Sequence, residues 1–388
     1  GDSSGIGYGG KLFEKGMGKG AGGSGVGIAG LAMLGGGAML ALGAVKKVAD
    51  FTYKTAKETN TTEEKAAQIS VSARGAGESY VDPKTLLAEA YATTQNVKGT
   101  TADEALDAVA KFGALTGDFD TARKSMQTFA TVSKATNSEM GAVAQSVASI
   151  SQQFKITDPE QIKDVLASLT YQGKSGAIEL PDLAQGLQRL AAAGAAFGLS
   201  KNVGGVKTLG GLTQVARRGT GSSEQTFTAL ERVFASLLQN SAEFGKQRVK
   251  IYEGKGANKK TRDIDEILVD AISKVGGTNI QKKNEKLGKL FGEEAMRAIN
   301  PMVAIYQSAF GAAKGTGGAE PTNKERQAAG AEALRTALNE ASNAAGTWKD
   351  VQQDAARMTA TNTAKTTAMW EAVKAKFGIE FAADEHDA

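Results

Sequence analysis

The chain has 388 residues, of which 48 are glycine, and it contains five prolines, no cysteine and one histidine. The absence of cysteine excludes a disulfide framework, a thiol nucleophile and a thiolate zinc site. A single histidine also argues against histidine-rich metal sites and most Ser–His catalysis. The net charge is only +4, whereas proteins that neutralise nucleic-acid phosphates usually carry far more basic charge. We therefore expect no cofactor, no ordinary hydrolase and no sequence-specific binding of nucleic acid.

Residues 1–45 form a glycine-rich apolar segment that holds 17 of the 48 glycines. Its last 25 residues, 21–45, carry no charge and are flanked by lysines on both sides. As a helix they would be long enough to span a bilayer, although glycine weakens a helix in water. Small residues at GxxxG spacing allow close helix packing in lipid. We predict a candidate membrane-inserting helix here, with Gly23, Gly27, Leu31, Leu34 and Leu40 as its characteristic residues.

From residue 46 onward the apolar residues recur with the period of an α-helix. Thr101 and Glu104 have the spacing of a capping box, and Asp82-Pro83 and Asp158-Pro159 are typical helix starts. Helix ends are predicted at Gly99, Gly117, Gly173 and Gly198. One short strand is predicted at residues 249–252, before a lysine-rich turn. The predicted fold is therefore all-α, an extended array of amphipathic helices with at most one short β-hairpin.

Residues 139–150 and 179–190 resemble each other at a spacing of 40, and each set presents one apolar helix face. Two helical units related in this way would stack like a solenoid or pack as a bundle. Chance similarity between two amphipathic helices explains the match equally well.

The last fifth of the chain is predicted to begin with a flexible linker. Residues 46–310 form the predicted helical core, residues 311–321 a flexible glycine-rich linker, and residues 322–388 long C-terminal helices. Apolar residues after the linker alternate at spacings of three and four, and they include Leu334, Leu338, Ala341, Trp348 and Val351. This pattern favours a helix–helix seam of the coiled-coil type or, equally, a helix packed on its own domain.

The motifs that could carry chemistry lack their structural context. Residues 25–30 match GxGxxG, but no strand precedes them, as a dinucleotide site requires. Asp120 and Asp263 belong to carboxylate pairs that we interpret as helix caps. The lysines of residues 255–289 have no aromatic residues interleaved and are interpreted as a solvated face. No metal site or catalytic site is predicted.

Residues 44–376 resemble the core region of bacteriophage tail tape-measure proteins. The resemblance is carried by the order of helical segments and not by one specific motif. The segments are residues 72–124, 137–150, 173–200, 248–272 and 290–303, followed by two closing helices. The chain departs from the family in having neither long coiled-coil flanks nor a peptidoglycan hydrolase, and it begins with Gly1, which suggests a processed product or a piece of a longer protein.

The resemblance implies a structural, non-enzymatic protein packed in the lumen of a tail tube or tail tip. It implies a homotrimer that templates tail assembly with the tail tube protein, distal hub or tip proteins and tail assembly chaperones. It also implies release ahead of the genome to help form a channel in the host envelope, where residues 21–45 would meet the membrane.

Two other classes of function remain open from the sequence. A pore-forming toxin or bacteriocin-like protein could use residues 21–45, although such proteins usually need two apolar helices. A virion-associated peptidoglycan hydrolase would instead depend on a catalytic Glu or Asp.

Overall fold

The fold was analysed in a computed structural model of the chain. The chain divides into two units, Gly1–Lys54 and Thr55–Ala388, of which the second contains all of the described residues. The structure describes residues 61–77, 81–176, 178–197, 199, 202–254, 260–315, 319–343 and 347–384.

The described chain is all-α apart from one two-stranded ribbon, which confirms the predicted fold class. Local capping explains where several helices start. The hydroxyl of Thr101 accepts a hydrogen bond from the backbone N–H of Glu104, and the Glu104 carboxylate accepts one from the Thr101 N–H. Asp158 accepts hydrogen bonds from the backbone N–H groups of two following residues. Gly117 ends its helix with a left-handed backbone at φ 75°, as predicted.

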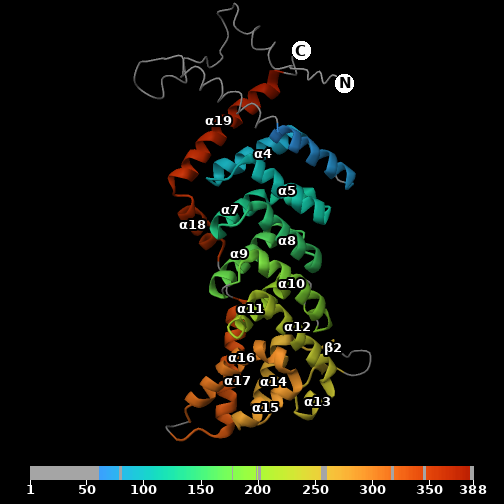
Figure 1. Cartoon of the computed structure of the whole chain (residues 1–388), viewed down its shortest axis with the longest axis vertical. Helices are drawn as coiled ribbons and strands as arrows, with labels where there is room; N and C mark the ends of the chain where they lie inside the picture. Colours follow the sequence, from blue (N-terminus) through green and yellow to red (C-terminus); the bar gives the residue numbers. More distant parts are fainter. Residues whose placement is uncertain are drawn as a thin grey trace, which may run out of the picture. The chain divides into compact units, whose positions relative to one another are not determined.

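Four helical hairpins follow one another between residues 83 and 239 and stack in sequence order (Figure 1). The first helices are α4 (Pro83–Asn96), α7 (Met126–Thr136), α9 (Pro159–Gly176) and α11 (Val203–Arg217). The second helices are α5 (Ala102–Thr116), α8 (Met140–Phe154), α10 (Leu180–Gly194) and α12 (Ser223–Gln239). Each helix packs on its partner within the hairpin and on the corresponding helix of the next hairpin. A short helix, α6 (Phe119–Lys124), connects the first two hairpins.

The spacing of the hairpins explains the internal repeat in the sequence. The second helices begin at residues 102, 140, 180 and 223, about 40 residues apart. Val143 and Val147 of α8 are buried, as are the residues 40 positions later, Leu183 and Leu187 of α10. Because α8 and α10 also pack on each other, the stacked-unit interpretation of the repeat is supported.

Beyond α12 the chain forms a further group of helices around one small ribbon. These elements are α13 (Ser241–Lys246), β1 (Tyr252–Glu253), β2 (Lys260–Thr261), α14 (Ile264–Lys274), α15 (Ile280–Phe291) and α16 (Glu293–Ala312). The strands are antiparallel, with Tyr252 opposite Thr261. The predicted strand at residues 249–252 overlaps β1 only at Tyr252. Val249 and Ile251 precede the ribbon and are buried.

The last three helices run back along the hairpin stack. They are α17 (Asn323–Ser342), α18 (Trp348–Met358) and α19 (Asn362–Asp384). The first of them, α17, packs on α11, α14 and α16, whereas α18 packs on α7 and α9, and α19 packs on α4. Segments far apart in sequence therefore lie side by side, as the red and cyan helices of Figure 1 show.

Glycine inside helices allows neighbouring elements to approach closely. A Cβ placed on Gly211 of α11 would lie 2.5 Å from the backbone nitrogen of Ser342 at the end of α17. A Cβ on Gly330 of α17 would lie 2.6 Å from the ring of Tyr306 in α16. The predicted helix end at Gly173 is wrong for a similar reason, because this glycine lies inside α9, where a Cβ would meet the carbonyl oxygen of Ile178 at 2.9 Å.

We predict that Gly211→Ala destabilises the fold although alanine is the better helix former. The added methyl group meets backbone and not a flexible side chain, so overpacking should lower the free energy of unfolding by about 1–3 kcal/mol. The matched control is Gly288→Ala in α15, where a Cβ would meet nothing within 4 Å. This control should gain up to about 1 kcal/mol from helix propensity. Chemical denaturation of both variants measures the difference, and equal stabilities would contradict the packing argument.

Candidate functional site

The described residues contain no group of three or more His, Cys, Asp or Glu side chains arranged to hold a metal ion. Among the same residues, no helix is both long and apolar enough to cross a membrane. The described surface has shallow depressions, among them one between successive hairpins and one beneath a C-terminal helix. Charged side chains line both depressions, and Lys283 is a buried charged residue elsewhere in the fold.

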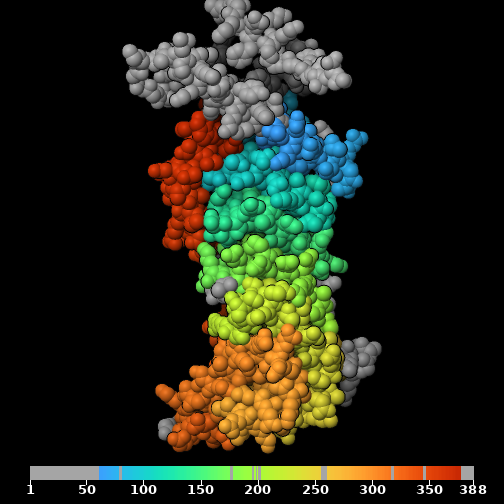
Figure 2. All heavy atoms as spheres, viewed as in Figure 1, coloured from blue at the N-terminus to red at the C-terminus, as the bar shows by residue number. Residues whose placement is uncertain are grey.

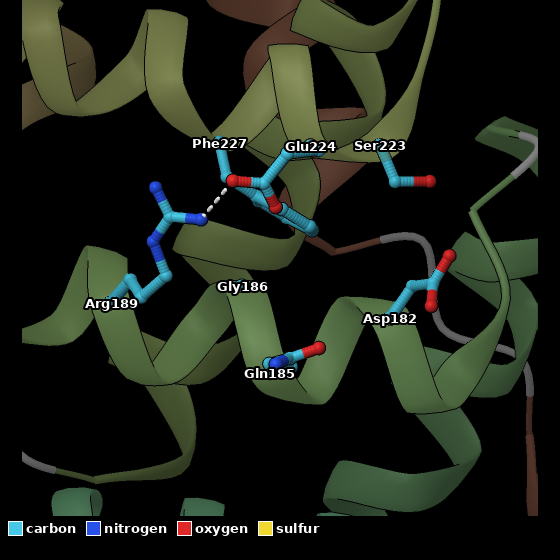
Figure 3. A pocket seen from close by; sticks show the side chains of 7 residues that line it. All are labelled: Asp182, Gln185, Gly186, Arg189, Ser223, Glu224 and Phe227. Carbon is cyan, nitrogen blue, oxygen red and sulfur yellow. Dashed lines mark hydrogen bonds and ion pairs between the residues drawn. The ribbon is translucent and has the colours of Figure 1, made fainter.

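The first depression lies between α10 and α12 and has a volume of about 100 Å³ (Figure 3). Gly186 lets α10 and α12 approach closely here, because the ring of Phe227 lies where a Cβ would otherwise stand. The residues that line it are Asp182, Gln185, Gly186, Arg189, Ser223, Glu224 and Phe227.

Arg189 joins the two walls of this depression. Its Nε and Nη2 donate to the two carboxylate oxygens of Glu231 at 2.9 and 2.8 Å, and Nη1 donates to Glu224 at 2.5 Å. The hydrogen bonds to Glu231, followed by those to Glu224, raise the pKa of Arg189 above its ordinary value. Because two carboxylates neutralise the guanidinium, the depression is better suited to joining hairpins than to binding an anion.

The second depression lies between α9 and α18 and has a volume of about 280 Å³. Lys174 of α9 and Asp354 of α18 form an ion pair across it, and Val351 is the buried apolar residue at its edge. The lining residues are Thr170, Tyr171, Lys174, Asp350, Val351, Gln353, Asp354 and Arg357. The interface between α9 and α18 is therefore incompletely packed.

Lys283 of α15 is buried to 1% exposure and ends the neighbouring helix α14. Its Nζ donates to three backbone carbonyls, those of Ile272 at 2.6 Å, Ser273 at 3.1 Å and Val275 at 2.8 Å. These carbonyls belong to the C-terminal turn of α14, where the helix lacks partners of its own and favours a cation. The Nζ also lies 4.9 Å from the centre of the Tyr306 ring.

Burial changes the pKa values of both residues in this cluster. It lowers the pKa of Lys283 to about 8, because the charged ammonium loses water. It raises the pKa of Tyr306 to about 12 for the same reason, since the phenolate would be the charged form. Lys283 is thus a structural cation and not a surface charge.

The predicted membrane residues Gly23, Gly27, Leu31, Leu34 and Leu40 lie outside the described residues. Their assignment to a membrane segment stays a prediction.

The five residues of the predicted seam are found on two helices. Leu334 and Leu338 of α17 and Val351 of α18 are buried, and Ala341 and Trp348 are half-buried against the same core. The Nζ of Lys163 in α9 lies 5.5 Å from the Trp348 ring. These contacts are intramolecular, and they correspond to the alternative of helices packed on their own domain.

The interpretation of Asp120 as a helix cap is wrong, whereas Asp263 is found at a cap position. The cap of α6 is Asp118, whose carboxylate accepts from the backbone N–H of Thr121 at 2.8 Å. Asp120 lies two residues further on, in the first turn of α6, and pairs with Lys124 and Arg123. The hydrogen bond from Lys124 does most to lower its pKa. Asp263 occupies the cap position of α14 but makes no side-chain capping bond there.

The lysine-rich stretch is also not uniformly solvated. Lys260 is exposed and pairs with Glu253 at 2.9 Å, whereas Lys283 is buried. The sequence contains a signal for this, because Lys283, Leu287 and Phe291 follow one another at intervals of four on one helix face. The partners of Arg189 and Lys283 were not predictable, since they come from other helices.

A comparison with protein families gives a match to the family described as phage-related minor tail protein over residues 85–292. This match covers more than half of the chain. The chain belongs to this family. Comparisons with curated proteins and with solved structures gave no match.

The matched region of this minor tail protein begins in α4 and ends directly after α15. It therefore contains all four hairpins, the Arg189 depression and Lys283. Family membership gives the protein a structural role in a phage tail and a location in the tail of the virion. Arg189 and Lys283 fit such a role, because both hold helices of this minor tail protein together.

We predict that stability of the minor tail protein rises with pH through the titration of Lys283. Its pKa is about 8 in the folded chain and about 10.5 when unfolded, so the unfolded state binds the proton more tightly between these values. From pH 8 to 10.5, the free energy of unfolding should increase by up to about 3 kcal/mol relative to Lys283→Met. Urea unfolding across this range tests the slope. Lys282→Met, at an exposed position, should keep the wild-type slope, and an unchanged slope in Lys283→Met would contradict the assignment.

We also predict that Arg189→Met weakens the contact between α10 and α12. Loss of a bidentate, half-buried ion pair should lower the free energy of unfolding by about 1 kcal/mol. Arg232→Met is the matched control, since Arg232 pairs with Glu294 at 3.4 Å and is 65% exposed. It should cost less than about 0.5 kcal/mol. Thermal unfolding at low salt compares the two, and equal losses would count against a special role for Arg189.

Proposed function

We propose that this minor tail protein is a tape-measure protein packed in the lumen of the tail tube or tail tip. In that role it templates tail assembly and leaves ahead of the genome to help form a channel in the host envelope. The observation that carries the proposal is the family match, which spans the whole hairpin stack. The order of helical segments along residues 44–376 supports the same function.

The repeated construction of the hairpin stack is compatible with leaving through a narrow tube. Each hairpin packs on the hairpins before and after it, so stability is divided among neighbouring interfaces. Such an array can lose one unit after another without first breaking a single central core. The chain also contains no cysteine, so no disulfide would have to be reduced before it extends.

The proposed membrane step rests on residues 21–45, an uncharged stretch of sufficient length with lysines on both sides. The proposed partners are the tail tube protein, distal hub or tip proteins and tail assembly chaperones, and the proposed assembly is a homotrimer. The proposal includes no catalytic step.

The test separates assembly from delivery. Deletion of the gene should abolish tails or leave tails of uncontrolled length, as seen by electron microscopy. Replacing Leu31, Leu34 and Leu40 together by lysine should leave tails assembled but reduce plaque formation by at least about tenfold, because charge in an inserted helix is strongly unfavourable.

The matched control replaces the same three leucines by isoleucine, which keeps the segment apolar and should keep infectivity. Normal tails without the gene would contradict the tape-measure function. Unchanged infectivity of the lysine variant would contradict only membrane insertion. Cell killing by the purified protein alone would favour a pore-forming toxin, and clearing of peptidoglycan in a zymogram would favour a hydrolase.

A further inference from the structure

We infer that α18 and α19 form a releasable strap, which can leave the hairpin stack while the stack and α17 stay folded. The strap is the pair of helices Trp348–Met358 and Asn362–Asp384. In Figure 2 its atoms (red) form a ridge beside the hairpin helices on the face shown. The inference concerns a conformational change of this chain and does not rest on the proposed tail function.

The helix before the strap is firmly fixed. Leu334 and Leu338 of α17 are buried, and its C-terminal turn touches Gly211 of α11 backbone to backbone. The Nε2 of the buried Gln172 donates to the carbonyl of Ala341 at 3.0 Å. Arg335 adds a hydrogen bond of 2.9 Å to Glu266 of α14. The end of α17 is therefore a fixed point from which a following segment can swing.

The strap itself is held by few and small apolar side chains. In α18 only Val351 and Ala355 are buried. Among the described side chains of α19, the buried apolar ones are Ala364 and Ala375. Large apolar side chains lie on its outer side instead, since Met369 is 57% exposed. The largest apolar side chain that the strap places against the core is Trp348, which is only half-buried.

The contacts of α18 with α9 include an ion pair and a cation–π contact, in addition to the packing of α18 on α7. The Lys174–Asp354 ion pair crosses the depression of about 280 Å³, and the Nζ of Lys163 lies over the Trp348 ring. Both partners of the ion pair are accessible to solvent, so salt screens their attraction. The interface is open to solvent at this depression, so it makes fewer dispersion contacts than a closely packed one.

Glu371 is the anchor of α19. One of its carboxylate oxygens accepts a hydrogen bond from the backbone N–H of Ala102 at 3.0 Å, and the other accepts from Lys374 at 3.0 Å. This places a buried negative charge at the N-terminus of α5, where the helix dipole favours it. Because the Thr101–Glu104 capping box satisfies two other donors of that terminus, α5 would stay capped after the strap leaves.

The N-terminus of the strap is capped by residues of its own and not by the stack. Thr347 and Asp350 form a capping box of their own at the start of α18, with the Thr347 N–H donating to Asp350 at 2.8 Å. The residues between α17 and this cap are Asn-Ala-Ala-Gly, a sequence without a large side chain. Release therefore requires breaking only the contacts between strap and stack. The strap stays attached to α17 through the short connection.

Hydrogen-exchange mass spectrometry on the full chain tests the strap. Amides of α18 and α19 should exchange together and faster than those of α8, α10 and α17, because they open without global unfolding. Raising NaCl from about 0.05 to about 1 M should accelerate exchange in the strap selectively, since the Debye length falls from about 14 to about 3 Å. Exchange of the strap and α8 at one common rate under both conditions would overturn the inference.

Two variants sharpen the result. Glu371→Gln should speed exchange in α19 by about tenfold and leave α8 unchanged, because it removes the charge at the α5 terminus. Glu340→Gln, at an exposed position of α17, is the control and should change neither. Equal effects of both variants, or loss of protection in α8 with Glu371→Gln, would contradict a separately releasable strap.

Discussion

The fold depends on apolar helix faces that a single hairpin cannot bury by itself. Each of the four hairpins leaves one side of its two helices to be covered by the next, and α5, α8, α10 and α12 form the continuous row that results. Glycine sets how closely these layers approach, as the Phe227 ring against Gly186 shows. The charged groups at the site follow from this packing, because Arg189 and Lys283 bridge elements that burial has already brought together.

The local structure was largely predictable from the sequence, and the long-range structure was not. The Thr101 capping box, the start at Asp158-Pro159 and the end at Gly117 depend on residues a few positions apart, so their signals are complete in the sequence. The predicted helix end at Gly173 was wrong because the sequence does not distinguish a glycine that ends a helix from one that lets another segment pack closely. The sequence also could not decide whether Leu334 belongs to a coiled-coil seam or to a helix packed on its own domain, because the partners of Leu334 lie in other helices.

The candidate site shows the same limit more strongly. The spacing of Lys283, Leu287 and Phe291 indicates that the lysine shares a buried face, but nothing nearby reveals that it ends α14. Glu371 is separated by 269 residues from the amide that it caps. Such partners become visible only in three dimensions. The family match places the hairpin stack in a protein of the phage tail, and among the described residues no group of three or more His, Cys, Asp or Glu side chains could hold a metal ion.

The return of α19 to α4 has a consequence for the order in which the protein forms. Hairpin contacts join residues within about 40 positions, so they can form soon after each segment leaves the ribosome. The docking surfaces on α4, α5, α7 and α9 are therefore complete before α18 and α19 are synthesised. The contact between α19 and α4 closes a long loop, and the entropic cost of that closure falls on this late docking step only. Within the described part of the chain, α19 therefore docks on a first hairpin that is already formed.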